Sequence, residues 1–360
     1  MENLLINVLH NRKTDREMGV YSACTANEVV IRTVLKKALA SNTVAVIEAT
    51  ANQVDQNGGY TGMTPENFKD MVYRLADEVG IEQDRIILGG DHLGPLTVSH
   101  LDESEAMAYA KELVKAYTLA GFTKLHIDTS MKVSSDDQNE RLSDETIARR
   151  ACELIQVTEE AWSTLPEPKC KIAYIIGSEV PIPGGAQEIT EMQVTSVEDF
   201  YKTAETFQEL MKEYELNIFD QVVAIVVQPG VEERDAESVR YNRENAAELT
   251  ASLSKYDPMV FEGHSSDYQS KKHLRQMVED GIAILKVRPA LTFAYREALF
   301  ALSAIENQLI EQKEDRGNYI EVLRDEMVSD PSRWNKYYFG TEQELEIKRL
   351  YSFSDRARYY

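Results

Sequence analysis

An acid and an imidazole stand side by side in the segment ILGGDHLGP, where Asp91 and His92 follow an apolar run and precede a glycine-proline turn. Such a pair could bind a metal ion and move a proton, because imidazole nitrogens ligate divalent metals and a carboxylate can act as a general base. It could also be two polar residues in a tight loop. The choice depends on whether other ligand-type residues occupy equivalent places along the chain.

Other ligand-type residues do follow apolar runs. Glu179 ends KIAYIIGSE and His264 follows MVFEG, so His92, Glu179 and His264 form a His/Glu/His set that suits a divalent metal with one open position. Zinc is the expected metal, with nickel, cobalt or manganese as alternatives. A single histidine is more often a hydrogen-bonded loop or core residue. Because His126 also falls at the end of a run, three of the six histidines do so, which favours a metal site.

The apolar runs alternate with longer helical patterns from near residue 20 to near residue 312. Eight strand-like segments, each followed by a plausible helix, are the number expected for a TIM (β/α)8 barrel. An open, doubly wound sheet is less favoured, because no GxGxxG turn follows the first strand. We therefore predict a barrel over residues 1–312 and an aromatic-rich C-terminal extension, 313–360, packed on it. The predicted strands are 19–26, 43–51, 85–91, 124–130, 171–179, 222–229, 259–265 and 282–289.

Two helices show clear start and stop signals. Thr64 precedes PENFKDMVYRLADEV and is a candidate N-cap, and Gly80 is the candidate stop. Asp102 or Ser104 could cap the helix that ends at Gly121.

Chemistry in such barrels occurs at the carboxyl ends of the strands. In KLHIDTS, His126 and Asp128 share one face of the strand, while Leu125 and Ile127 share the other. We expect the polar face to point into the barrel and the apolar face to meet the helices. Asp128, and Glu48 at the end of segment 43–51, are therefore candidate catalytic carboxylates beside Asp91.

The substrate is expected to contact polar residues at the same strand ends. Phosphate sites in barrels commonly use the loops after strands seven and eight, where Lys286 and Arg288 occur. Lys286 could equally be an ion-pair partner of Glu48 or Glu262 inside the barrel. The candidate substrate-binding residues are Asn52, Gln53, His126, Gln228, Ser265, Ser266, Asp267, Lys286 and Arg288.

Two further features near these ends have open roles. The glycine-rich segment 52–65, NQVDQNGGYTGMTP, could be a lid over the site or a flexible surface loop. Cys24 ends the first strand and could face the site, although a buried structural thiol is the more common role.

Composition limits the classes of partner. With 61 acidic and 39 basic residues the formal charge is -22, so nucleic acid and anionic membrane surfaces are not expected partners. Three cysteines without paired spacing, no signal peptide and no long apolar run predict a reduced, cytoplasmic protein without membrane spans. Walker A, GxSxG and CxxC patterns are absent, which argues against a P-loop kinase, a serine hydrolase and a structural zinc module.

Several long motifs carry a family resemblance. They include VIEATANQVDQNGGYTGMTP, ILGGDHLGP, KLHIDTSM, IGSEVPIPGG, VFEGHSSDYQ, ILKVRPALTFAYREALFAL and YSFSDRARYY. Together they resemble the GatZ/KbaZ family of tagatose metabolism, from about residue 20 to the C-terminus. Because that family is related to class II aldolases, the resemblance implies a TIM barrel and a sugar-phosphate substrate.

The resemblance also implies roles for single residues. Class II aldolases carry an Asp-His pair in which the acid transfers a proton and the histidine binds zinc, and Asp91 and His92 match it. Glu179 before a glycine pair, and His264 before two serines, resemble two further aldolase motifs. Gln228 stands where the aldolases have another histidine.

Two functions accompany the family. The main prediction is a metal-dependent 4-epimerase that interconverts fructose 6-phosphate and tagatose 6-phosphate, or related ketoses, by retro-aldol cleavage and re-addition, with Asp91 taking and returning the C4 hydroxyl proton. The alternative is a non-catalytic subunit that stabilises a class II tagatose-bisphosphate aldolase chain. A homo-oligomer is expected in either case. Arg288, where the family pattern has glycine, predicts a different anion or sugar in the site.

Overall fold

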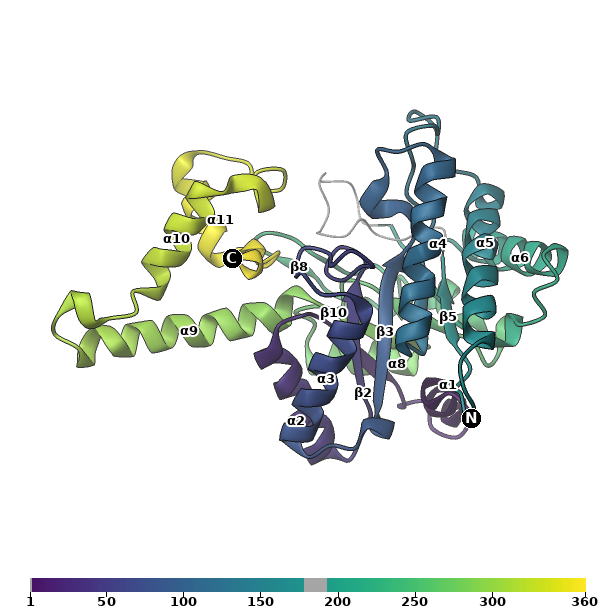
Figure 1. Cartoon of the computed structure of the whole chain (residues 1–360), viewed down its shortest axis with the longest axis horizontal. Helices are drawn as coiled ribbons and strands as arrows, with labels where there is room; N and C mark the ends of the chain where they lie inside the picture. The colour runs from purple at the N-terminus through teal and green to yellow at the C-terminus, as the bar shows by residue number, and fades with distance from the viewer. Residues whose placement is uncertain (1, 178–192) are drawn as a thin grey trace.

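Eight parallel strands form a closed barrel in the computed structural model, which describes residues 2–177 and 193–360 (Figure 1). The strands follow the order β1-β10-β9-β6-β5-β4-β3-β2 around the barrel. This confirms the predicted TIM barrel, and only β3 runs past its predicted end. The strands are β1 Val20–Cys24, β2 Ala45–Thr50, β3 Ile86–Leu93, β4 Lys124–Ile127, β5 Ala173–Ile176, β6 Val222–Val227, β9 Val260–Gly263 and β10 Ile282–Val287.

Helices surround the barrel and continue beyond it (Figure 1). A short antiparallel hairpin, β7 Glu232–Glu233 and β8 Ser238–Val239, lies in the connection after β6. The helices are α1 Leu4–His10, α2 Glu28–Ser41, α3 Pro65–Val79, α4 Glu103–Ala120, α5 Asp144–Ser163, α6 Val197–Glu213, α7 Ala247–Ser252, α8 Lys271–Glu279, α9 Pro289–Leu309, α10 Tyr319–Ser329 and α11 Glu342–Tyr351.

The predicted helix signals act as expected. Thr64 accepts a hydrogen bond from the backbone N–H of Asn67, whose side chain returns to the Thr64 backbone, so a capping box starts α3. Of the two candidate caps for α4, the structure uses Asp102. Gly80 and Gly121 end the two helices with φ of 81° and 92°, in the left-handed region that glycine adopts without steric cost.

Apolar side chains fill two layers. Between strands and helices, Leu125 and Ile127 are fully buried in the larger core, as the alternation in KLHIDTS predicts. Inside the barrel, near the amino-terminal ends of the strands, Val46 and Ile87 belong to a second cluster. Leu5 of α1 packs in the same cluster and closes this end. Burying a leucine side chain such as that of Leu5 contributes roughly 1.5–3 kcal/mol.

The residues after the barrel form a separate group of helices. Helix α9 projects away from the barrel, and α10 and α11 fold back above it (Figure 1). Their own small core contains Leu323, Met327, Trp334, Tyr338 and Leu350. The last turn, η8 Arg356–Tyr359, returns the chain to the barrel mouth.

Within residues 2–177 and 193–360, no helix combines the length and the apolar character that crossing a membrane requires.

Candidate metal centre and cavity at the barrel mouth

Three histidines from different strand ends meet inside the barrel. His92 lies on β3, His126 on β4, and His264 directly follows β9. Their ring centroids are 5.1, 5.2 and 5.3 Å apart, and all three side chains are buried. The structure therefore brings together two of the predicted metal ligands, His92 and His264, with His126, which the sequence assigned to substrate. Glu179, the third predicted ligand, lies outside the described residues.

A backbone irregularity turns both Asp91 and His92 inward. The pairing of β3 with β4 shifts register between Gly90 and Leu93, and His92 has φ of 51°. In a regular strand, two consecutive residues point to opposite faces. Here Asp91 contacts Lys286 at 2.8 Å while His92 contacts other interior groups, so the bulge places both in the site.

Each imidazole has one ring nitrogen against a buried carboxylate. The contacts are Nδ1 of His92 to Oδ2 of Asp128 at 2.7 Å, Nδ1 of His126 to Oδ1 of Asp91 at 2.9 Å, and Nε2 of His264 to Oε1 of Glu262 at 3.1 Å. Glu262 is a histidine partner that was not predicted from the sequence, although Glu262 and His264 are two residues apart and share a strand face.

The carboxylates in these pairs are ionised. Burial raises the pKa of Asp128, but the hydrogen bond and charge of His92, together with His126 and the Ser130 hydroxyl, outweigh it and lower the pKa below its usual range. The same balance, with His92 and Lys286 as the main opposing groups, lowers the pKa of Asp91, and Lys124 lowers that of Glu262. An ionised carboxylate can only accept hydrogen bonds. The facing ring nitrogens of His92 and His264 therefore carry the protons. Nδ1 of His126 is shared between Oδ1 of Asp91 and the backbone N–H of His92, which lies 3.3 Å away.

On His92 and His264 the opposite ring nitrogens then carry lone pairs. Nε2 of His92, Nε2 of His126 and Nδ1 of His264 are buried, and none has a hydrogen-bond partner among the described residues. Burial lowers the pKa of His264 to about 3, so its ring is neutral at physiological pH. Carboxylates that fix the tautomer of a histidine are the usual outer shell of a metal site. These residues fit a divalent metal held by three imidazoles.

Ligand atoms of the neighbouring carboxylates lie close enough to take part. Asp91, His126, Glu262 and His264 each offer one ligand atom, and these atoms all lie within 4.8 Å of one another; His92 is not part of this set.

A buried layer of charge lies among the strands next to this cluster. Nζ of Lys286 pairs with Glu48, with Asp91 at 2.8 Å and with Glu262 at 3.2 Å. Lys124 pairs with Glu48 and, at 2.7 Å, with Glu262. Of the two roles open for Lys286, the structure therefore shows the interior ion pair. Glu48 is held between two lysines, and Gly89 provides its space, because a Cβ there would lie 2.6 Å from Glu48 Cγ.

Four of the predicted substrate-binding residues instead belong to the turns and loops after the strands, where three of them make hydrogen bonds to the backbone. Oε1 of Gln228 accepts hydrogen bonds from the backbone of residues 230 and 231. Ser266 donates to the carbonyl of Lys286, and Asp267 accepts from the backbone N–H groups of residues 288 and 290 at the start of α9. Ser265 has φ of 60° in the turn after β9. None of these four is among the described residues that line the main cavity at the mouth.

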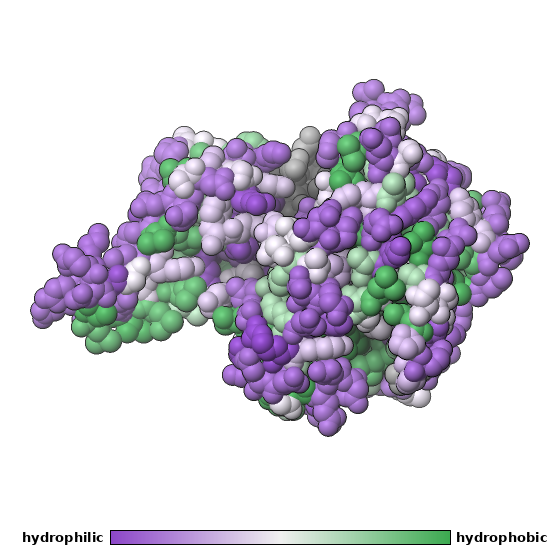
Figure 2. All heavy atoms as spheres, viewed as in Figure 1, coloured by the Kyte–Doolittle hydropathy of each residue, from purple (hydrophilic) through white to green (hydrophobic). Residues whose placement is uncertain are grey.

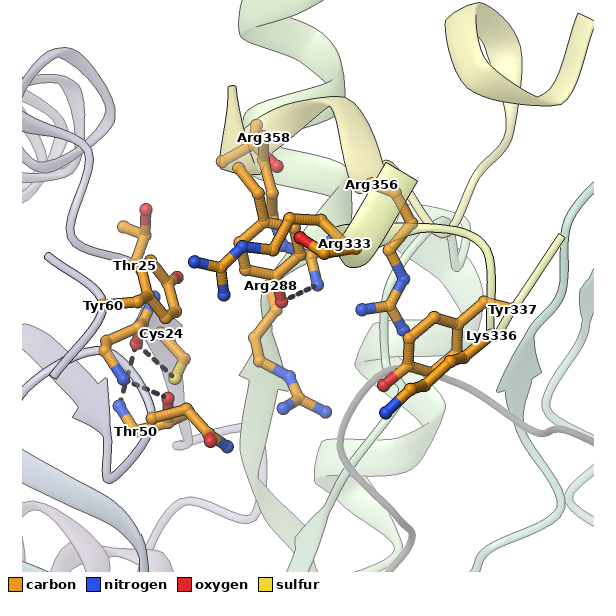
Figure 3. Close-up of a pocket in the computed structure, with 15 residues that line it drawn as sticks. Cys24, Thr25, Thr50, Tyr60, Arg288, Arg333, Lys336, Tyr337, Arg356 and Arg358 are labelled. Carbon is orange, nitrogen blue, oxygen red and sulfur yellow. Dashed lines mark hydrogen bonds between the residues drawn. The ribbon is translucent and has the colours of Figure 1, made fainter. Parts of the chain in front are cut away.

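That cavity has a volume of about 220 Å³. Of the predicted substrate residues, Asn52, Gln53 and Arg288 line it, and Tyr60 shows that the segment 52–65 forms part of its wall. Figure 3 shows Cys24, Thr50 and Tyr60 on one side, residues of the C-terminal segment on the other, and Arg288 between them.

The C-terminal segment supplies functional candidates that the sequence analysis missed. The described charged residues in the cavity lining are all cations: Arg288, Arg333, Lys336, Arg356 and Arg358. The two arginines and two tyrosines of DRARYY were the available signal, but their presence at the end of the chain does not show where the tail folds.

Cys24 connects the cavity with the histidine cluster. Its side chain lines the cavity, and its Sγ lies 3.4 Å from Oδ2 of Asp91. Burial raises the pKa of the Cys24 thiol, so the residue stays protonated. It is thus both a buried thiol and a part of the site.

Comparison with known proteins identifies close relatives. The family model described as "D-tagatose-1,6-bisphosphate aldolase subunit GatZ/KbaZ-like" matches residues 5–360. The D-tagatose-1,6-bisphosphate aldolase subunit GatZ of Salmonella agona (strain SL483) is 44% identical over 355 residues, which cover 98% of this chain and 82% of that protein.

Solved structures include one of similar identity to this chain and one that shares only its fold. A crystal structure named as a probable tagatose 6 phosphate kinase from Sinorhizobium meliloti 1021 has a TM-score of 0.86 at 42% identity, covering 95% of this chain and 83% of that one. Fructose-bisphosphate aldolase from Campylobacter jejuni has a TM-score of 0.52 at 16% identity, covering 84% and 80%, which shows a shared fold.

Proposed function

Because this chain belongs to the GatZ/KbaZ-like family of D-tagatose-1,6-bisphosphate aldolase subunits, we propose that it serves tagatose metabolism with a divalent metal and a ketose phosphate at the barrel mouth. The three buried imidazoles, each with a carboxylate on one nitrogen and no hydrogen-bond partner among the described residues on the other, carry this proposal. Buried polar atoms normally have a hydrogen-bond partner, so three nitrogens without one in the same place favour a bound ion there.

The names of the relatives favour one finer function, a subunit that supports an aldolase catalytic chain. A surface feature agrees with it. Leu302, Ile305 and Leu309 are 59%, 53% and 77% exposed on the projecting part of α9, and apolar colour follows this helix in Figure 2. Exposed apolar patches of this kind commonly mark a protein interface. We propose the aldolase chain as its occupant, with a second copy of this chain as the alternative.

The interior of the barrel favours a second function, turnover by the chain itself as a ketose-phosphate 4-epimerase. Asp91 is ionised and uses Oδ1 for His126 and Lys286, whereas Oδ2 faces Cys24 at the cavity. Oδ2 accepts from the Cys24 thiol and lies 3.8 Å from Nε2 of His92, so a substrate hydroxyl would take the place of the thiol as its hydrogen-bond partner.

The proposed reaction inverts the configuration at C4 of the ketose phosphate and neither adds nor removes atoms. Asp91 takes the proton of the C4 hydroxyl as the C3–C4 bond breaks, and the bonding electrons remain with the C1–C3 fragment as an enediolate. The resulting aldehyde turns its other face, the C3–C4 bond forms again, and Asp91 returns the proton to the C4 oxygen. A divalent metal in the site would supply Lewis-acid stabilisation of negative charge on the substrate oxygens.

One experiment tests both functions. Protein loaded with zinc or cobalt is incubated with fructose 6-phosphate or tagatose 6-phosphate, with and without chelator, and the C4 epimers are separated. In parallel, the protein is mixed with a class II tagatose-bisphosphate aldolase chain and cleavage of the bisphosphate is followed. Chelator-sensitive interconversion supports the epimerase, and stimulated cleavage supports the subunit. Absence of both, at measured full metal loading, rejects the proposal.

Matched variants separate a specific interface from general loss of solubility. Leu302→Asp on α9 should abolish stimulation of the aldolase chain. Leu119→Asp, on the barrel helix α4 and similarly apolar at 45% exposure, should leave it unchanged. Equal effects of the two variants would remove α9 as the docking surface.

A further inference from the structure

The cavity beneath the C-terminal segment is positive in a strongly negative protein. The chain carries a formal charge of -22, yet the described charged residues that line the cavity are five cations. Four of them, Arg333, Lys336, Arg356 and Arg358, come from residues beyond the barrel, and one, Arg288, comes from the end of β10. A local reversal of the overall charge indicates a site for an anion.

Three of these cations are available to a ligand. Within the part of the chain that the structure describes, no carboxylate lies within ion-pairing distance of Arg288, Arg333 or Lys336. Elsewhere many lysines and arginines pair with carboxylates, as Arg275 does with Glu279 at 2.9 Å. Guanidinium and ammonium groups without an internal acceptor can give all their hydrogen bonds to a phosphate.

The positive charge of the cavity also acts on Tyr359, which lies next to Arg358. Burial opposes ionisation of Tyr359, but Arg358 and Arg356 outweigh it and lower the pKa of the phenol. Arg356 also lies over the ring of Tyr337, 3.3 Å from the centroid, which holds its guanidinium plane (Figure 3).

The barrel fixes the position of the C-terminal turn. Asp355, directly before the two arginines, accepts a hydrogen bond from Thr292 and pairs with Arg296 at 3.0 Å, both on α9. The hydroxyl of Tyr268 donates to the carbonyl of Phe353 at 2.7 Å. Arg356 and Arg358 are therefore presented by a segment that α9 and Tyr268, in the loop after β9, hold in place, as a preorganised binding site requires.

We propose that this C-terminal segment binds the phosphate group of a phosphorylated ketose, at the end of the sugar remote from the histidine cluster. Cys24 places the cavity directly beside Asp91, with Sγ 3.4 Å from Oδ2, so a phosphate among the cations directs the carbon chain toward the reacting site. The identity of the sugar rests on the proposed function; the phosphate site does not.

The size of the cavity limits the ligand class. Its volume of about 220 Å³ is below the ~300 Å³ at which pockets for drug-sized ligands begin. A sugar monophosphate, with part of its carbon chain in the adjoining barrel, suits this space better than a nucleoside triphosphate.

The test measures binding without catalysis. Metal-free protein is titrated with fructose 6-phosphate, inorganic phosphate and fructose, and the dissociation constants are compared. The double variant Arg333→Gln/Lys336→Gln removes two exposed charges from the cavity, and Lys271→Gln/Arg275→Gln removes two exposed charges from α8, outside it. Both variants change the net charge equally.

The expected result is tighter binding of fructose 6-phosphate than of fructose, weakened about tenfold or more by the cavity variant and unchanged in the α8 control. Equal binding of the two sugars, or equal losses in both variants, would overturn the inference. A phosphate preference without turnover or aldolase stimulation would reject the proposed function and leave the phosphate site standing. Turnover without a phosphate preference would reject the phosphate site and leave the proposed function standing.

Discussion

Nδ1 of His126 lies 2.9 Å from Oδ1 of Asp91, and this contact determines what each residue can do. Because Asp91 is ionised, it can only accept a hydrogen bond at this contact, while the backbone N–H of His92 faces the same nitrogen at 3.3 Å. Nε2 of His126 is buried and has no hydrogen-bond partner among the described residues. Asp91 keeps Oδ2 on the cavity side, next to Cys24. Asp91 orients His126 and can move a proton, and His126 presents a ring nitrogen to a metal.

Replacing Asp91 by Asn should separate its two roles. The amide oxygen can still face His126, but it is too weak a base to accept the C4 hydroxyl proton. We expect turnover to fall by about 10²–10⁴-fold, while metal content at saturating zinc stays at the wild-type value. Epimerisation rate and metal content are measured on the same sample. Normal turnover would remove Asp91 from the mechanism, and complete loss of metal would make it a ligand.

Replacing His126 by Asn tests whether it binds metal or substrate. As one of three ligands, its loss should weaken metal binding by more than the roughly 10–100-fold that removal of an outer-shell partner costs. Affinity is measured by competition with a chromophoric chelator, and the absorption of the cobalt form reports the ligand set. His100→Asn, at an exposed position, is the control. Unchanged metal affinity with a raised KM would instead support the substrate role predicted from sequence.

Replacing Lys286 by Met should destabilise the fold. The substitution removes the cation that Glu48, Asp91 and Glu262 share in a fully buried layer, and only Glu48 and Glu262 keep a second lysine, Lys124. Breaking a buried ion pair by removing one partner typically costs about 3–5 kcal/mol. Urea unfolding measures the difference in free energy of unfolding. Lys336→Met, at an exposed position, should change stability by less than about 0.5 kcal/mol. A similarly small effect at Lys286 would contradict the ion-pair role.

Asp267 should make stability depend on pH. Burial, and then the charge of Glu233, raise the pKa of Asp267 to about 7, whereas in the unfolded chain it is about 3.9. Between these values the folded state keeps a proton that the unfolded state has lost. The free energy of unfolding therefore falls as pH rises from about 4 to about 7, by up to about 1.4 kcal/mol per pH unit.

Asp267→Asn should flatten this slope. The amide oxygen can still accept from the backbone N–H groups of residues 288 and 290, but the side chain no longer titrates. Urea unfolding at pH 5 and pH 8 is compared in both proteins. The variant should gain stability relative to the wild type as pH rises, and parallel pH profiles would contradict the assignment.

The sequence determined the barrel and the location of its chemistry. The alternation of polar and apolar residues, helix caps such as Thr64 and stops such as Gly80 depend on neighbours a few residues away, so they can be recognised along the chain. The same local pattern placed Asp91, His92, His126 and His264 at strand ends, where a parallel barrel gathers them.

The tertiary structure decided which of these groups meet. The bulge after Gly90 turned Asp91 and His92 inward together, and interstrand register gave Lys286 its three carboxylates. The cations of the C-terminal segment reach Cys24 only because the chain returns to the barrel after more than 300 residues. Contacts of this kind depend on how distant segments approach in space, and no local spacing of residues encodes them.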